Sequence, residues 1–339
     1  MSIASLLSEV TPRSGGLLAD WWLLVLLAAS FAAAVLAGAM PPRKVSGPDR
    51  IPSGRPAWLL LGVMFGALGV YLFTTSVYLS LKYPSPAGLA ATTQPHELTA
   101  EDNAFASTVP PLLGFLALLA GDAAVRDMTR QDLGIAPRRA SRGIVWGLIG
   151  VVIVVPPLFL LEEIVEAVYR RVHYTHPTEH PLLHLLREKP SPAVVAAIVI
   201  GACVIAPLFE ELLFRGHLQT LLRRMFYRLG TRRDPAAPPS FPRGFPVITG
   251  QPVETELPAD DPPAPSPPPT AAQTWAAIIL TSLVFALVHP AWSMPVIFVL
   301  ALCLGYAYER TGNLWVSITI HAGFNTISTV IFLTSLYGR

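Results

Sequence analysis

Two adjacent carboxylates and two imidazoles lie within apolar stretches of this 339-residue chain. Glu210 and Glu211 follow the apolar run 192–209, His289 ends a second such run, and His321 lies inside a third. A charged side chain at mid-bilayer costs about 2.5–3.5 kcal/mol on insertion scales, so such groups normally face a wet cavity in which they pair or react. A carboxylate can act as a general base, and a histidine can hold or pass a proton. The sequence therefore predicts a buried hydrolytic centre.

The first run places two carboxylates and a guanidinium close together. Adjacent residues of a helix differ in direction by about 100°, so Glu210 and Glu211 point to different sides. Glu211 and Arg215 are four residues apart and can form an ion pair, which limits the penalty of burying each charge. Glu210 is then left to face the cavity, where an apolar surrounding makes a carboxylate a stronger proton acceptor. An ion-pair cluster at a helix end, without chemistry, is the alternative for this segment taken alone.

The other two runs each add a histidine with a partner four residues away. His289 ends an apolar helix just before Pro290, and Phe285 precedes it by one turn. His321 and Asn325 are also one turn apart, so the imidazole and the carboxamide share one helix face. A structural hydrogen bond between helices remains open for each of these polar groups.

Taken together, these segments resemble a known family. The patterns EExxxR, FxxxH and HxxxN, in this order on three successive helical segments, are similar to those of the CPBP family of intramembrane proteases. That family includes the CAAX prenyl endopeptidases and bacterial proteins tied to bacteriocin processing and self-immunity. Residues 132–135 (Asp-Leu-Gly-Ile) and the run 305–315 agree with the resemblance, which covers roughly 132–330.

The resemblance implies hydrolysis of peptide bonds within the membrane. Glu210, assisted by His289, would activate a water molecule. His321 and Asn325 would donate hydrogen bonds to the developing oxyanion, where each donor is commonly worth about 2.7–4 kcal/mol. Glu211 would order the site and could share in the catalysis. The supporting residues would be Arg215 and Phe285.

A metal-dependent scheme is the alternative for the same residues. Glu210, His289 and His321 could form a three-ligand Zn²⁺ site with an open position for water. The sequence has no HExxH pattern, and Asn325 suits an oxyanion donor better than a zinc ligand. We therefore favour a scheme that requires no metal and no other cofactor.

The composition of the chain indicates that membrane-spanning helices position the candidate site residues. Hydrophobic residues make up 52% of the chain and charged residues only 14%, against about 25% in a typical soluble domain. Apolar runs near 20 residues recur, each long enough to cross a hydrocarbon core about 30 Å thick. We expect an all-α polytopic membrane protein, a bundle of about eight transmembrane helices around a buried polar catalytic cavity. The expected spans are 17–40, 57–81, 104–121, 143–161, 192–214, 272–289, 294–309 and 313–336.

The chain divides into four parts by composition. Residues 1–131 should form about three N-terminal transmembrane helices, and 132–230 the first half of the protease core. Residues 231–271 form a proline-rich segment that we interpret as a disordered cytoplasmic loop, because proline removes backbone donors and blocks helix. It is either a tolerated insertion or a ligand for a proline-recognition domain. Residues 272–339 should complete the core.

Basic residues alternate between the loops. Residues 41–56, 122–142 and 216–271 are rich in arginine, whereas 82–103 has one lysine beside three acidic residues. The positive-inside rule places the basic loops in the cytoplasm and both termini outside. The bias toward alanine, proline and arginine suggests a bacterium, so we expect the bacterial cytoplasmic membrane.

The segment 162–191 fits this topology poorly, because it should be external yet carries several basic residues. We interpret Glu166 and Arg170 as an ion pair on a separate interfacial helix. A lid over the site, a metal-binding loop and an ordinary loop all stay open for the histidines of this segment. These are His173, His176, His180 and His184.

The expected partners are the lipid bilayer and a membrane protein or peptide as substrate. A bacterial origin argues against prenylated substrates, and no basic patch or zinc-finger spacing points to nucleic acid. A catalytically silent membrane scaffold or bacteriocin self-immunity protein of the same fold is the main competing function. A proton-coupled transporter is a third, although the chain shows no internal repeat of the kind such proteins often have.

Overall fold

The structure, a computed structural model, is helical with no strand in the part of the chain that it describes. Six of these helices are long and apolar enough to cross a membrane, which confirms a polytopic helical membrane protein. The expected first span, 17–40, lies outside the described residues, as does nearly all of the proline-rich segment. The described residues are 58–84, 98–125, 134–176, 191–231 and 270–337.

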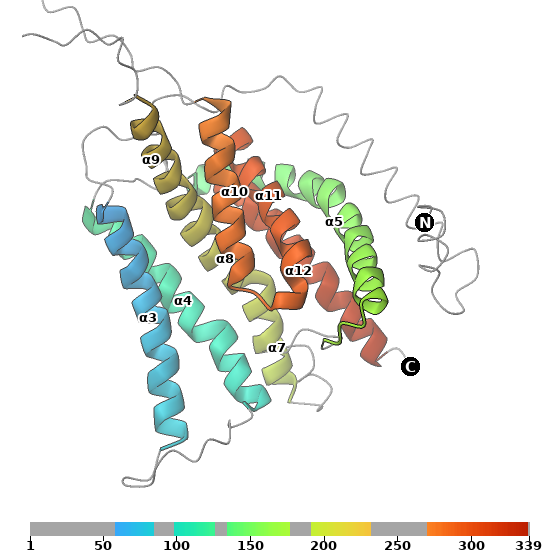
Figure 1. Cartoon of the computed structure of the whole chain (residues 1–339). Coiled ribbons are helices and arrows are strands. Elements are labelled where there is room, and N and C mark those ends of the chain that lie inside the picture. Colours follow the sequence, from blue (N-terminus) through green and yellow to red (C-terminus); the bar gives the residue numbers. More distant parts are fainter. Residues whose placement is uncertain (1–57, 85–97, 126–133, 177–190, 232–269, 338–339) are drawn as a thin grey trace, which may run out of the picture.

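The bundle has two flanks and a central column. In Figure 1, α3 and α4 lie side by side on one flank, and α5 packs along α12 on the other. Between them stands a continuous column that runs from α7 to α9, with α10 and α11 packed against it. The main helices are α3 Trp58–Lys82, α4 Ala100–Val125, α5 Ala140–Arg171, α7 Pro192–Ile200, α8 Ala206–Glu211, α9 Thr220–Thr231, α10 Ala271–Leu287, α11 Met294–Thr311 and α12 Leu314–Tyr337. Short elements join them: the 3-10 turns η2 Pro137–Arg139 and η6 Ala291–Ser293, and the π-helical segments η4 Gly201–Ile205 and η5 Leu212–Gln219.

Helix α5 is longer than the sequence suggested. It continues past the expected end at residue 161 to Arg171, through Pro156 and Pro157. Membrane helices tolerate such prolines because neighbouring groups satisfy the freed carbonyls. Glu166 and Arg170 therefore lie in the last turns of α5, and the separate interfacial helix predicted for them is not present.

The histidine-rich segment begins directly after α5. His173 has a left-handed φ of 56°, which ends the helix. The imidazole of His176 turns back to Glu166, with Nε2 3.1 Å from Oε1. His180 and His184 lie outside the described residues, so the three interpretations of this segment stay open.

Helix α10 is short for a membrane span. Its 17 residues extend about 25 Å, less than a hydrocarbon core of about 30 Å. By itself, α10 is therefore too short to cross the whole hydrocarbon layer.

Residues of the two further segments that agree with the family resemblance, 132–135 and 305–315, lie in contact in the fold. Gly312 follows α11 with a φ of 58°, and Gly134 has a φ of 76°, conformations that favour glycine. A Cβ on Gly134 would lie 2.5 Å from the carbonyl oxygen of Gly312, so the two backbones pack in direct contact. The side chain of Asn313 also donates to the carbonyl of Arg139 at 3.0 Å. These contacts fix the start of α5 against the turn between α11 and α12.

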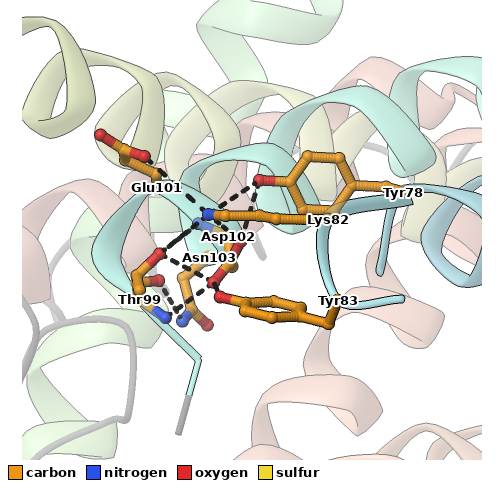
Figure 2. A network of polar contacts seen from close by, with 7 residues as sticks. All are labelled: Tyr78, Lys82, Tyr83, Thr99, Glu101, Asp102 and Asn103. Atoms are coloured by element: carbon orange, nitrogen blue, oxygen red, sulfur yellow. Dashed lines mark hydrogen bonds and ion pairs between the residues drawn. The ribbon is translucent and has the colours of Figure 1, made fainter. Parts of the chain in front are cut away.

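A polar cluster joins the ends of α3 and α4 far from these segments (Figure 2). Asp102 accepts hydrogen bonds from Lys82 Nζ at 2.6 Å, Tyr78 at 2.9 Å and Tyr83 at 2.7 Å. The amide and hydroxyl of Thr99 also donate to it, at 2.8 and 2.7 Å. Donation to Asp102 raises the pKa of the Tyr83 phenol, because the bond favours the protonated form. The cluster ties the two helices of this hairpin together.

Candidate active site

Glu211 is the centre of a fully buried polar cluster. Its Oε1 accepts a hydrogen bond from Arg215 Nη1 at 2.8 Å, so the ion pair predicted from their spacing is present. The same oxygen lies 2.9 Å from Nδ1 of His321 on α12. The side chains of Glu211 and Arg215 have no exposed surface, and Arg215 reaches the carbonyl of Ala301 at 3.4 Å. Two of the three motifs therefore meet at one carboxylate.

Glu210 lies beside this cluster with a different environment. Its side chain is 25% exposed, and its Oε2 lies 3.8 Å from Nε2 of His321, too far for a hydrogen bond. Among the described residues this oxygen has no hydrogen-bond partner. Glu210, rather than Glu211, is thus the carboxylate that can reach a water molecule or a substrate.

Phe285 is the apolar centre around which the charged groups are arranged. Its ring is fully buried and lies 4.3 Å from the Arg215 guanidinium, close enough for a cation–π interaction. The imidazole of His289 is 4.7 Å from the ring centroid, and that of His321 is 5.8 Å away at a steep angle. Phe214 meets the ring edge to face at 5.0 Å. A residue expected only to support the site therefore contacts both histidines and the arginine.

His289 is positioned by its own helix. Its Nδ1 lies 2.7 Å from the carbonyl oxygen of Phe285, so Nδ1 carries the proton in this bond and Nε2 is left to accept one. The structure connects His289 to the Glu211 cluster through the ring of Phe285.

Asn325 is placed differently from the other motif residues. It lies one turn beyond His321 on α12, as expected, but its Nδ2 donates to the carbonyl of Ala202 at 2.8 Å. Ala202 belongs to the π-helical segment η4, before the two glutamates. The amide is thus bonded to the backbone of the motif helix and not to Glu210 or Glu211.

The glutamates lie on a short α-helical stretch between two π-helical segments. A π-helix contains one extra residue per turn and is frequent at functional sites. In η5, Nδ1 of His217 lies 2.8 Å from the carbonyl of Leu212, and Nε2 lies 2.9 Å from Asp122 on α4. Sequence reasoning missed this buried pair, because the two residues lie far apart in the chain and a polar residue at the end of a span is ordinary.

Helix α3 adds a residue that sequence reasoning also missed. The ring of Tyr71 stacks on that of Phe209 at 5.7 Å, with 3° between the planes. Glu210 is the next residue after Phe209 in the motif helix. A Cβ on Gly114 of α4 would come within 2.7 Å of the Phe209 ring, so α4 closes the other side. The α3–α4 hairpin therefore forms one wall next to Glu210.

The zinc alternative requires three ligand side chains grouped around one point. In the described part of the chain, no three or more His, Cys, Asp or Glu side chains are grouped closely enough to hold a metal ion. Glu210 and His321 are near one another, whereas the contacts of His289 are with the carbonyl and the ring of Phe285. As placed, these three residues do not fit a metal site.

A comparison with known families matches the helices that carry these motifs. Residues 192–236 and 267–327 match a family described as type II CAAX prenyl endopeptidase Rce1-like. The interval between the two matched segments lies inside the proline-rich segment, as expected for an insertion. No curated protein and no solved structure matches the chain. The predicted family resemblance is therefore confirmed over the helices that carry all three motifs, and there the chain is similar to the CAAX prenyl endopeptidases.

Proposed function

We propose that the chain is an intramembrane endopeptidase that hydrolyses peptide bonds of membrane-associated proteins or peptides. The observation that carries the proposal is the position of Glu210, a partly exposed carboxylate beside an imidazole that a buried carboxylate orients. The similarity to a family of endopeptidases supports it independently.

Glu210 is the general base of this proposal. The partly exposed carboxylate of Glu210 takes a proton from a water molecule, whose oxygen then forms a bond to the scissile carbonyl carbon. The carbon–nitrogen bond breaks next, and the proton held by Glu210 passes to the leaving amine. His289 assists through its Nε2, which is free to accept a proton because Nδ1 is bonded to Phe285.

His321 stabilises the oxyanion. The carboxylate of Glu211 can only accept a hydrogen bond when ionised, so Nδ1 of His321 carries a proton and the ring is fixed with Nε2 toward Glu210. As an imidazolium, with a proton on each ring nitrogen, His321 donates from Nε2 to the carbonyl oxygen as its charge develops, and removal of such a donor commonly costs about 2.7–4 kcal/mol. One N–H of the Asn325 amide is bonded to the carbonyl of Ala202, and we give the main donor role to His321, whose Nε2 lies beside Glu210.

The proposed reaction uses no metal, because Glu210, His289 and His321 are not arranged as a ligand set. Cleavage should therefore survive treatment with a zinc chelator at full rate. Stoichiometric zinc in the purified protein, together with loss of cleavage on chelation and recovery on adding zinc back, would contradict this part of the proposal.

We also propose that the segment 231–271 faces the cytoplasm of a bacterial cell. Arginines lie on η2, on α9, which precedes this segment in the chain, and in the last turn of α11. Basic residues near membrane helices favour the cytoplasmic side. An epitope inserted at residue 250 should resist external protease in intact cells and be cleaved after lysis.

The experiment that tests the function compares membrane proteomes of cells that carry the wild type or Glu210→Ala. Proteins processed only in the wild type are expected. Glu163→Ala is the matched control, because this glutamate lies exposed on α5 and its loss should change nothing. If Glu210→Ala supports every activity of the wild type, the chain is a scaffold or immunity protein and the proposal fails.

A further inference from the structure

Pro207 interrupts the backbone bonding of the motif helix at a definite place. In η4 the amide of Ala206 bonds the carbonyl of Gly201, five residues earlier. The next bond of this pattern would run from residue 207 to the carbonyl of Ala202. Proline has no backbone N–H, so that bond cannot form. The carbonyl of Ala202 is left without the donor that its segment would otherwise supply.

The side chain of Asn325 occupies the position of the missing donor. Its Nδ2 lies 2.8 Å from the Ala202 oxygen. One turn further along α12, Thr329 meets Cys203, with 3.7 Å between Oγ1 and Sγ. Two successive residues of η4 therefore contact two residues on one face of α12.

The bond between Asn325 and the carbonyl of Ala202 matters because it lies inside a candidate membrane span. The column from Pro192 to Leu229 is a candidate membrane span, and no water is available in the hydrocarbon layer to bond a free carbonyl. On the opposite side, Gly201 packs directly on the backbone of Ser107 in α4, so η4 is held between two helices. A shift of η4 would carry α8, which bears Glu210, with it.

We propose that Pro207 and Asn325 form a matched pair in which the amide of Asn325 replaces the missing backbone donor and positions α12 on the motif helix. Asn325 is then a positioning residue. It sets the distance between Glu210, which follows η4, and His321, one turn before Asn325 on α12. The catalytic part of this inference rests on the proposed function, whereas the bond itself does not.

A double-mutant cycle on thermal unfolding tests the pair without any substrate. Asn325→Leu keeps the approximate size but removes the donor, and should lower the midpoint of the purified full chain by about 4 °C. Pro207→Ala restores an N–H at residue 207. In that background, Asn325→Leu should lower the unfolding midpoint by less than half as much as it does in the wild type. Equal losses in both backgrounds would overturn the proposal. In the control background Pro157→Ala, an exposed proline of α5, the full loss should remain.

Kinetics separate positioning from direct contact with the substrate. The probe is a membrane protein that the wild type processes and Glu210→Ala does not. Asn325→Leu should lower kcat about tenfold with KM unchanged, and Pro207→Ala combined with it should recover at least a third of the wild-type kcat. Recovery of the unfolding midpoint without recovery of kcat would show that Asn325 acts directly on the oxyanion, against the positioning role. If the wild type processes no membrane protein that Glu210→Ala leaves intact, the proposed function is refuted. The double-mutant cycle on unfolding then still tests whether Pro207 and Asn325 form a matched pair.

Discussion

Two buried carboxylate clusters in this bundle differ in how completely their oxygens are bonded. Both oxygens of Asp102 are saturated, with two donors on one and three on the other. In the motif cluster only Oε1 of Glu211 is engaged, and Oε2 of both glutamates lacks a hydrogen-bond partner within the described residues. A saturated network holds a fold together, whereas an unsatisfied buried acceptor calls for an explanation such as a catalytic role. The comparison thus separates a structural carboxylate from one available for chemistry.

The largest effect on stability should come from breaking the buried ion pair of the motif cluster. Arg215→Met removes the guanidinium that pairs with the buried Glu211 and leaves it only the bond to His321, which should lower the unfolding free energy by about 3–5 kcal/mol. Denaturant titration in detergent micelles would measure it. Arg310→Met, at an exposed position on α11, is the control and should stay within about 0.5 kcal/mol of the wild type. A similar small change for Arg215→Met would mean that the pair is not a structural element of the site.

Phe285→Leu should affect activity more than stability. Leucine retains most of the apolar volume, so the unfolding free energy should fall by less than about 1.5 kcal/mol. Both histidines lose the ring against which they pack, and misplacement by about 1 Å can cost about 100-fold in rate. Turnover measured beside the unfolding free energy would separate the two effects. An unchanged turnover would show that Phe285 does not set the positions of the histidines.

The smallest effect should come from the saturated cluster. Asp102→Asn replaces one accepting oxygen with a donor that faces other donors, so the unfolding midpoint should fall by about 2–4 °C. Turnover per folded molecule should be unchanged, because the cluster lies at the far end of the α3–α4 hairpin. A midpoint equal to that of the wild type would mean that the network contributes nothing to the fold.

The sequence predicted the helical bundle and the motif residues from patterns that are local along the chain. Apolar runs marked the spans, and the spacing of Glu211 and Arg215 predicted their ion pair. The end of α5 was misplaced because hydropathy falls where Glu162 begins an acidic stretch, although charged side chains at a helix end can reach water while the helix continues.

Contacts between distant segments could not be predicted in the same way. Asp102 lay in what looked like an acidic loop, and its bonds to Tyr78 and Lys82 join residues that are 24 and 20 positions apart in the sequence. The π-helical segments leave no trace in a pattern with a period of 3.6 residues. Pro207 was a usable signal, because a proline in a helical run leaves a carbonyl that some polar side chain, here that of Asn325, must satisfy.

The most direct test of this account sets the two clusters against each other in one assay. Glu210→Gln and Asp102→Asn, each reconstituted as the full chain in liposomes, would be measured for both cleavage rate and unfolding midpoint. Glu210→Gln should lose about 10²–10⁴-fold in rate with an unchanged midpoint, and Asp102→Asn should show the reverse. A Glu210→Gln variant that cleaves at the wild-type rate would contradict the account.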